Sequence, residues 1–208
     1  GYKRLGIYLV FLVLYYGCEE QLGSSLVLFG ERHVDRGTPF GIIPAASLVT
    51  CNPLTILAIG PLFSGLLKKL PLSGFTKIGI SFLMLGAAFC VLYTGSLLAN
   101  QGQEVPLAYA VSSIVLISLG ELLIGPTVFA TASEVAPKAV SGLTMGAVSL
   151  GYSLANLFSG LLSQMMTVTD AMQSLEVYRS GFGTIALGAF ALSALLFIIT
   201  TRKKVFSS

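Results

Sequence analysis

Three acidic residues lie inside long apolar stretches of this 208-residue chain, where a charge is costly. Glu19, Glu20 and Glu121 each lie about 15 residues, or roughly 22 Å along a helix, from the start of their stretch. An acid at the centre of a membrane-spanning helix costs about 2.5–3.5 kcal/mol. Such a residue is expected to face a polar cavity, where its carboxyl group can take and release a proton. For Glu121 the alternative is a structural hydrogen bond from the protonated carboxyl to a backbone carbonyl.

The first stretch carries further polar residues on one face. At 100° per residue, Tyr16, Glu20, Ser24 and Glu31 fall within one broad stripe of a continuous helix. Glu31 lies roughly 16 Å above Glu20. This pattern predicts a cavity wall with a gate at its outer end. Alternatively, Glu31 simply pairs with Arg32 or Arg36, as exposed charges often do.

Two prolines are predicted to kink helices beside polar side chains. Pro53 follows Asn52, and Pro126 lies five residues after Glu121. Neither proline can donate a hydrogen bond to the carbonyl four residues earlier. Irregular backbone at membrane depth survives only where it lines a cavity or is buried in protein. Asn52 is therefore a candidate cavity residue, or alternatively a cap for the kink.

No other chemistry is indicated by the residue types. The single histidine, His33, lies in a polar connection, and the three cysteines lie in apolar runs. The sequence contains no HExxH, GxSxG or P-loop motif, and no cluster of metal-ligand spacing. We therefore expect neither an enzyme nor a bound metal.

The composition places the chain in the membrane. Hydrophobic residues make up 54% and charged residues only 10%, whereas soluble domains carry about 25% charged residues. This excludes a soluble enzyme and a nucleic-acid-binding protein. A spanning helix needs about 20 apolar residues, so we predict an all-α integral membrane fold with six transmembrane helices at Leu5–Phe29, Ile43–Leu67, Phe75–Leu98, Leu107–Ser133, Ala139–Met166 and Phe182–Thr201.

The positive charges predict the orientation. An even number of spans puts both termini on one side, and cytoplasmic loops are enriched in Lys and Arg. Nine of the 12 cations fall on the side of the termini: Lys3, Arg4, Lys68, Lys69, Lys77, Lys138, Arg202, Lys203 and Lys204. Both termini are therefore expected in the cytoplasm.

Several motifs, in order and in register, resemble the C-terminal half of the proton-dependent oligopeptide transporter family. Any one of these motifs is weak evidence for the family, whereas the set in this order and register is specific for it. They are Tyr16-Gly-Cys-Glu-Glu-Gln-Leu-Gly-Ser-Ser25, Arg32-His-Val-Asp35, Ile43-Pro-Ala-Ala-Ser47, Cys51-Asn-Pro-Leu54, Gly120-Glu-Leu-Leu-Ile-Gly-Pro126 and Ala136-Pro-Lys138.

The resemblance implies the fold and its organisation. Residues 1–208 would form the C-terminal six-helix bundle of a major-facilitator transporter, built from two inverted three-helix repeats. The N-terminal six-helix half is absent from this chain and would be a partner, in the same longer chain or in a separate one. An alternative is a half-transporter subunit that does not itself transport.

The resemblance also implies roles for the polar residues. Glu121 matches the acid that holds the peptide's amino group and pairs with a cation of the other half, and Asn52 matches the asparagine that helps to bind that amino group. Tyr16 and Gln21 would contact the substrate.

Gating and proton coupling would fall to three further acids, Glu19, Glu20 and, less closely matched, Glu31. Two departures affect the pocket: Gly125 replaces the usual serine before Pro126, and the chain has no tryptophan.

The function implied is symport of di- and tripeptides with protons across the inner or plasma membrane. The partners would be the lipid bilayer, a small peptide and the N-terminal half. The proton gradient would supply the energy without a cofactor. The alternative is a carrier of another small solute, such as an amino-acid derivative, nitrate or an organic acid.

Overall fold

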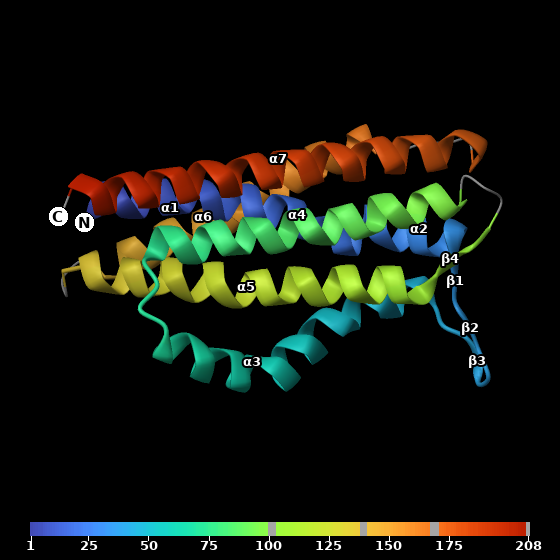
Figure 1. The fold of residues 1–208 in the computed structure, drawn as a ribbon, viewed down its shortest axis with the longest axis horizontal. Helices are drawn as coiled ribbons and strands as arrows, with labels where there is room; N and C mark the ends of the chain where they lie inside the picture. Colours follow the sequence, from blue (N-terminus) through green and yellow to red (C-terminus); the bar gives the residue numbers. More distant parts are fainter. Residues whose placement is uncertain (100–102, 138–140, 167–170, 207–208) are drawn as a thin grey trace.

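The computed structural model describes residues 1–99, 103–137, 141–166 and 171–206. Within these ranges six helical segments are long and apolar enough to cross a membrane. This confirms the predicted number of spans and an integral membrane protein of all-α class. The helices run side by side in one elongated bundle (Figure 1).

The first span is broken in its middle, contrary to the continuous helix assumed above. It consists of α1 (Tyr2–Glu19), a 3-10 helix η1 (Glu20–Gly23) and α2 (Ser25–His33). Ser24 separates the last two with a non-helical backbone (φ −123°, ψ −88°). Polar side chains such as those of Gln21 and Ser24 offer local alternatives to helical hydrogen bonds. Because the break changes the rotation and rise, the stripe from Tyr16 to Glu31 is not a single helical face.

The second span also begins irregularly. A 3-10 helix η2 (Ala45–Thr50) leads into α3 (Cys51–Lys69). Pro53 therefore lies in the first turn of α3. Backbone N–H groups there have no intrahelical partner, so a proline removes no helical hydrogen bond. Pro61, which the sequence analysis passed over, lies inside α3, and α3 bows away from α5 in its middle (Figure 1). Pro126 lies inside α5.

The remaining spans are α4 (Gly74–Ala99), α5 (Leu107–Val135), α6 (Ser141–Met165) and α7 (Ala171–Phe206). The predicted connection before Phe182 was wrong, since helix extends back to Ala171. No proline or glycine interrupts residues 171–180, and Arg179 lies 3.9 Å from Glu176 one turn earlier. The predicted start of the fifth span at Ala139 lies outside the described residues.

Four two-residue strands lie at the end of the bundle opposite the termini (Figure 1). β1 (Val34–Asp35) pairs in parallel with β4 (Val105–Pro106). β2 (Gly37–Thr38) pairs antiparallel with β3 (Gly41–Ile42). Gly41 has φ 123°, a conformation that residues with a Cβ rarely adopt. The strands lie in the loops between the spans, which they hold together by backbone pairing, and the spans themselves are helical.

The helices pack in related pairs. α1 packs on α6, α3 packs on α5, and α4 packs along α7. Exchanging the first three spans with the last three converts the α1–α6 pair into the α3–α5 pair and leaves the α4–α7 pair unchanged, as the repeat organisation predicts. The most deeply buried side chains lie on and around α4 and α5. They include Tyr15, Phe82, Leu85, Phe89 and Ile114.

Gly120 permits the closest approach in this core. A Cβ at this position would overlap the Tyr15 hydroxyl and lie 3.0 Å from the Ser81 carbonyl oxygen. The Tyr15 hydroxyl donates a 2.7 Å hydrogen bond to the Ile117 carbonyl, so it cannot move without losing a buried bond. By contrast, Gly142 and Gly146, the GxxxG pair of α6, have no such neighbour within 4 Å.

We predict that Gly120→Ala lowers the free energy of unfolding by about 1–3 kcal/mol, because overpacking costs this much in close-packed interiors. Gly146→Ala is the matched control and should be neutral or slightly stabilising. Thermal unfolding of the two purified variants in the same detergent measures the difference. Equal midpoints would contradict the packing described here.

Candidate functional site

Asn52 joins two of the intramembrane acids. Its amide nitrogen donates to Glu19 Oε1 at 3.0 Å and to Glu121 Oε2 at 3.3 Å. Asn52 is 8% exposed, and the two glutamates are half-buried. The structure thus brings together residues from the first, second and fourth spans, which lie far apart in sequence.

The local structure explains how each group is presented. Glu19 is the last residue of α1, just before the break, and Asn52 lies in the first turn of α3. Ser118 lies one turn before Glu121 on α5, and its hydroxyl lies 2.8 Å from the Ile114 carbonyl oxygen and 3.2 Å from Asn52 Oδ1. The amide nitrogen of Asn52 faces the two carboxyl groups, because only the nitrogen can donate to them.

The two carboxyl groups have no cationic partner among the described residues. Among the described residues the ion pairs are Arg4–Glu134 and Glu176–Arg179, neither of which involves Glu19 or Glu121. Two carboxylates in a site of low dielectric repel each other. A proton or an ammonium group bound there would remove that repulsion, so the arrangement is suited to binding either one.

An aromatic cavity of about 320 Å³ lies beside Glu121. Tyr16 packs edge-to-face on Tyr152 of α6, with ring centroids 4.7 Å apart, and Phe129 stacks on the other side of Tyr152 at 6.2 Å. Gly125 makes room for the Tyr16 hydroxyl, which would lie 3.0 Å from a Cβ at that position. Pro126 also lines the cavity. Its size is within the range of small-molecule pockets.

Gln21 is fully buried, and its hydrogen bonds are made within the protein. Its amide nitrogen donates to the carbonyl and hydroxyl oxygens of Ser159 at 3.1 and 3.0 Å. Its amide oxygen accepts from three serine hydroxyls: Ser24, Ser25 and Ser163. This network ties the break in the first span to α6, and it gives Gln21 a structural part in addition to any contact with a substrate.

The other two predicted gating acids make no hydrogen bond with this cluster among the described residues. Glu20 is exposed in η1, and Glu31 is exposed on α2. Arg36 donates to the backbone carbonyl of Glu31 at 3.3 Å, rather than to its carboxylate, and closes the loop through a 2.7 Å bond to the Ile43 carbonyl. Neither acid is joined to Asn52 or Glu121 among the described residues.

Sequence reasoning missed Ser118, Tyr152 and Ser159. Ser118 had a usable signal, since residues three apart share a helix face and it precedes Glu121 by that spacing. Tyr152 and Ser159 had none, because each acts by contact with a helix distant in sequence.

The fold and these contacts define a class of protein: a six-helix membrane bundle of the major-facilitator type, with a polar site at its middle. Solved structures of the same architecture include a peptide transporter POT in complex with sulfate, which superposes with a TM-score of 0.82 over 94% of this chain at 24% identity. A POT family transporter in complex with 5-aminolevulinic acid gives 0.79 over 94% at 21% identity. This chain covers 39% and 40% of those two chains.

The chain belongs to the POT family, whose sequence pattern it matches over residues 4–180. It is 31% identical over 203 residues to dipeptide and tripeptide permease A of Escherichia coli, covering 94% of this chain and 39% of the permease. It is 32% identical over 163 residues to the peptide transporter YePEPT of Yersinia enterocolitica, covering 75% of this chain and 32% of the transporter. These relatives are transporters rather than enzymes, and the chain spans about two fifths of the permease's length.

We predict that Asn52 is energetically coupled to both acids. Asn52→Ala should cost about 1.5–3 kcal/mol in stability, because hydrogen bonds to charged partners are worth that much. The loss should shrink by at least about 1 kcal/mol in a Glu121→Gln background, where the partner's charge is gone. Thermal unfolding of the four proteins gives the double-mutant cycle, and Thr55→Ala on the same helix is the control. Strict additivity would contradict the bridge.

Gln21→Met tests the second network. Methionine keeps roughly the side chain's length but leaves Ser159 and the three serine hydroxyls without their partner, so we expect stability to fall by about 2–3 kcal/mol. Exposed Ser153, which bonds only its own helix, supplies the control Ser153→Ala. Unchanged thermal stability together with weakened solute binding would show instead that Gln21 acts mainly on the substrate.

Proposed function

We propose that this chain is part of a transporter that moves di- and tripeptides into the cell together with protons. The observation that carries the proposal is the pair of carboxyl groups, Glu19 and Glu121, bridged by Asn52 without a cation nearby. The names of the E. coli and Yersinia relatives support a peptide as the solute. The proton gradient would supply the energy, and the mechanism requires no cofactor.

Each member of the cluster has a part in this mechanism. Glu121 borders the aromatic cavity and would hold the peptide's terminal ammonium group, with Asn52 assisting. Glu19 accepts a hydrogen bond from the same Asn52 amide and would carry the proton. The proton and the peptide's ammonium group would therefore be coupled through the Asn52 side chain. Binding of either one changes the charge that the other meets, which is the differential interaction that a ligand needs to shift a conformational equilibrium.

The aromatic cavity would receive a side chain of the peptide. Tyr16 forms one wall of it with Tyr152. Gln21 would act beside this site by holding the break in the first span. Glu20 and Glu31 are exposed at the break and on α2, and they would act in gating only where the other half of the transporter reaches them.

A second six-helix half is part of the proposal. The chain covers 39% of the permease it matches, and the order of its motifs resembles the C-terminal half. The N-terminal half, in the same longer chain or a separate one, would supply the opposite wall and the cation that Glu121 lacks here. Transport would proceed by rocking of the halves about the midplane site.

The protein would lie in the plasma or inner membrane with both termini in the cytoplasm. The distribution of Lys and Arg supports this orientation. The two chain ends lie at the same end of the bundle (Figure 1), as this topology requires.

An amino-acid derivative is the second candidate solute. The Tyr16 hydroxyl occupies the space beside Gly125, which narrows the cavity next to Glu121 and favours a small solute with one amino group. One POT family transporter of the same fold has been solved with 5-aminolevulinic acid.

We predict that Glu121→Gln in the intact transporter abolishes gradient-driven dipeptide uptake, lowering the rate at least about a hundredfold, because the amide cannot carry the charge that binds ammonium. Glu104→Gln, which neutralises an exposed acid outside the site, should leave uptake unchanged. Uptake of labelled dipeptide into proteoliposomes with an inward proton gradient measures both.

Wild-type uptake by Glu121→Gln would overturn the proposed role of Glu121. Competition with unlabelled dipeptides, tripeptides and 5-aminolevulinic acid separates the two solutes. If only the amino-acid derivative competes, the second candidate replaces the first.

A further inference from the structure

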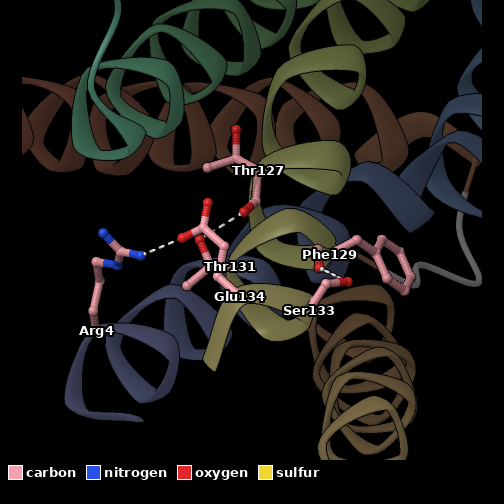
Figure 2. A network of polar contacts seen from close by, with 6 residues as sticks. All are labelled: Arg4, Thr127, Phe129, Thr131, Ser133 and Glu134. Carbon is pink, nitrogen blue, oxygen red and sulfur yellow. Dashed lines mark hydrogen bonds and ion pairs between the residues drawn. The ribbon is translucent and has the colours of Figure 1, made fainter. Parts of the chain in front are cut away.

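A second cavity lies at the end of the bundle that carries both termini. It has a volume of about 400 Å³ and is enclosed by the starts of α1 and α4, the end of α3 and the last turns of α5. We call it the end cavity. The wall on α5 is a single stripe at helical spacing, made by Leu122, Leu123, Pro126, Thr127, Ala130, Thr131 and Glu134. Figure 2 shows Arg4 reaching from α1 to Glu134 on this wall.

The charged groups of the end cavity give it a net positive charge. Arg4 and Lys77 line it together with one acid, Glu134. Arg4 Nη2 lies 2.7 Å from Glu134 Oε2, and the two side chains are 47% and 65% exposed. An ion pair this exposed is worth at most about 1 kcal/mol, so Arg4 can exchange its partner at little cost. Lys77 makes no ion pair with any described residue.

The start of α4 adds positive potential of a different origin. Gly74, the first residue of this 26-residue helix, lines the cavity, and the first turn contains no acid. Ser73 caps this end of the helix: its hydroxyl accepts a hydrogen bond from the Thr76 backbone N–H at 3.1 Å, and its carbonyl accepts one from the Lys77 N–H at 3.0 Å. The helix dipole therefore points its positive end toward the cavity.

A buried hydroxyl without a partner points into the same space. Tyr8 is 2% exposed, and its ring is held edge-to-face on Phe75 at 5.1 Å. Its hydroxyl lies against Gly74, so closely that a Cβ there would overlap it. No described residue hydrogen-bonds to this hydroxyl. The hydroxyls of Thr127 and Thr131 differ, because each already donates to a carbonyl of its own helix, at 2.6 and 2.9 Å.

The rest of the lining is apolar, which suggests the kind of molecule that fits. Leu67 and Leu72, from the end of α3 and the loop after it, face Leu122 and Leu123 across the cavity. α3 packs on α5 but makes little contact with α4, and we infer that a lipid enters between these two helices. A ligand with an anionic head and an apolar body matches both halves of the lining.

We propose that the end cavity binds the phosphate group of an anionic phospholipid from the surrounding leaflet. Lys77 and Arg4 neutralise the phosphate, the Tyr8 hydroxyl donates a hydrogen bond to it, the dipole of α4 adds positive potential, and the leucines hold the first part of an acyl chain. The charged groups and the Tyr8 hydroxyl of this site lie outside the Asn52 cluster, whereas Leu122 and Pro126 line both the end cavity and the aromatic cavity. A soluble phosphate ester offers the same head group without the apolar body.

The experiment measures lipid retained by the purified chain. The protein is extracted from bilayers with equal amounts of phosphatidylglycerol and phosphatidylcholine, and bound lipid is counted by native mass spectrometry. Wild type should retain mainly phosphatidylglycerol. Lys77→Gln should lower that preference about tenfold, the equivalent of one charge-assisted hydrogen bond, and Tyr8→Phe should lower it severalfold. Lys69→Gln is the matched control, since Lys69 is an exposed cation at the same end that does not line the cavity.

Three results would overturn the proposal: no preference for the anionic lipid, an equal loss with Lys69→Gln, or no loss with either cavity variant. Glycerol 1-phosphate and inorganic phosphate, added at millimolar concentration, test the source. If they displace the lipid completely, a soluble phosphate rather than a lipid is the ligand. Circular dichroism of each variant ensures that a loss reflects the site and not unfolding.

Discussion

The amide of Asn52 is the group on which the centre of this bundle depends. Among the described residues it is the donor that both Glu19 and Glu121 share, and removing it would leave two half-buried carboxyl groups without this hydrogen bond. Because a polar group left without its partner in a partly buried site is costly, this amide stabilises the relative positions of the first, second and fourth spans. In this site the carboxyl groups of Glu19 and Glu121 have a hydrogen-bond partner, but their negative charge is not balanced. A proton or a bound cation would balance it.

The break in the first span allows this arrangement. A continuous α-helix would carry Glu19, Glu20 and Gln21 around its axis at 100° steps, whereas the 3-10 turn at residues 20–23 leaves Glu19 facing Asn52 and lets Gln21 reach α6. Such a break is tolerated at membrane depth only where other groups satisfy the backbone and side chains. The Gln21–Ser159 bonds provide this, and they make the break a defined joint between α1 and α2.

The sequence was sufficient for the class of fold and for the acids, because apolar length and intramembrane charge are strong, local signals. It also singled out Asn52 as a candidate from its place beside Pro53, and the structure joins this residue to Glu19 and Glu121. It could not show that Glu19 rather than Glu20 meets Asn52, because that choice depends on the break, which has no periodic signature. The stripe to Glu31 failed for the same reason. The early start of α7 was missed because Asp170–Gly181 is polar, and polarity alone does not distinguish a loop from a helix that extends beyond the apolar segment.

The distribution of burial shows which face of the bundle lacks a partner. α4 and α5 bury residues along their whole length, whereas α3 and α6 expose many of their large apolar side chains, including Leu57, Leu62, Leu143 and Leu157. α1 and α5, which carry the two acids, contact α6 and α3 respectively, so the open aromatic cavity is flanked by the two least covered helices. Lipid could cover the leucines, but it offers no counter-charge to Glu121. We infer that a second half which covers α3 and α6 also brings a cation to the midplane. The same partner would then cover the exposed leucines and balance the charge of Glu121.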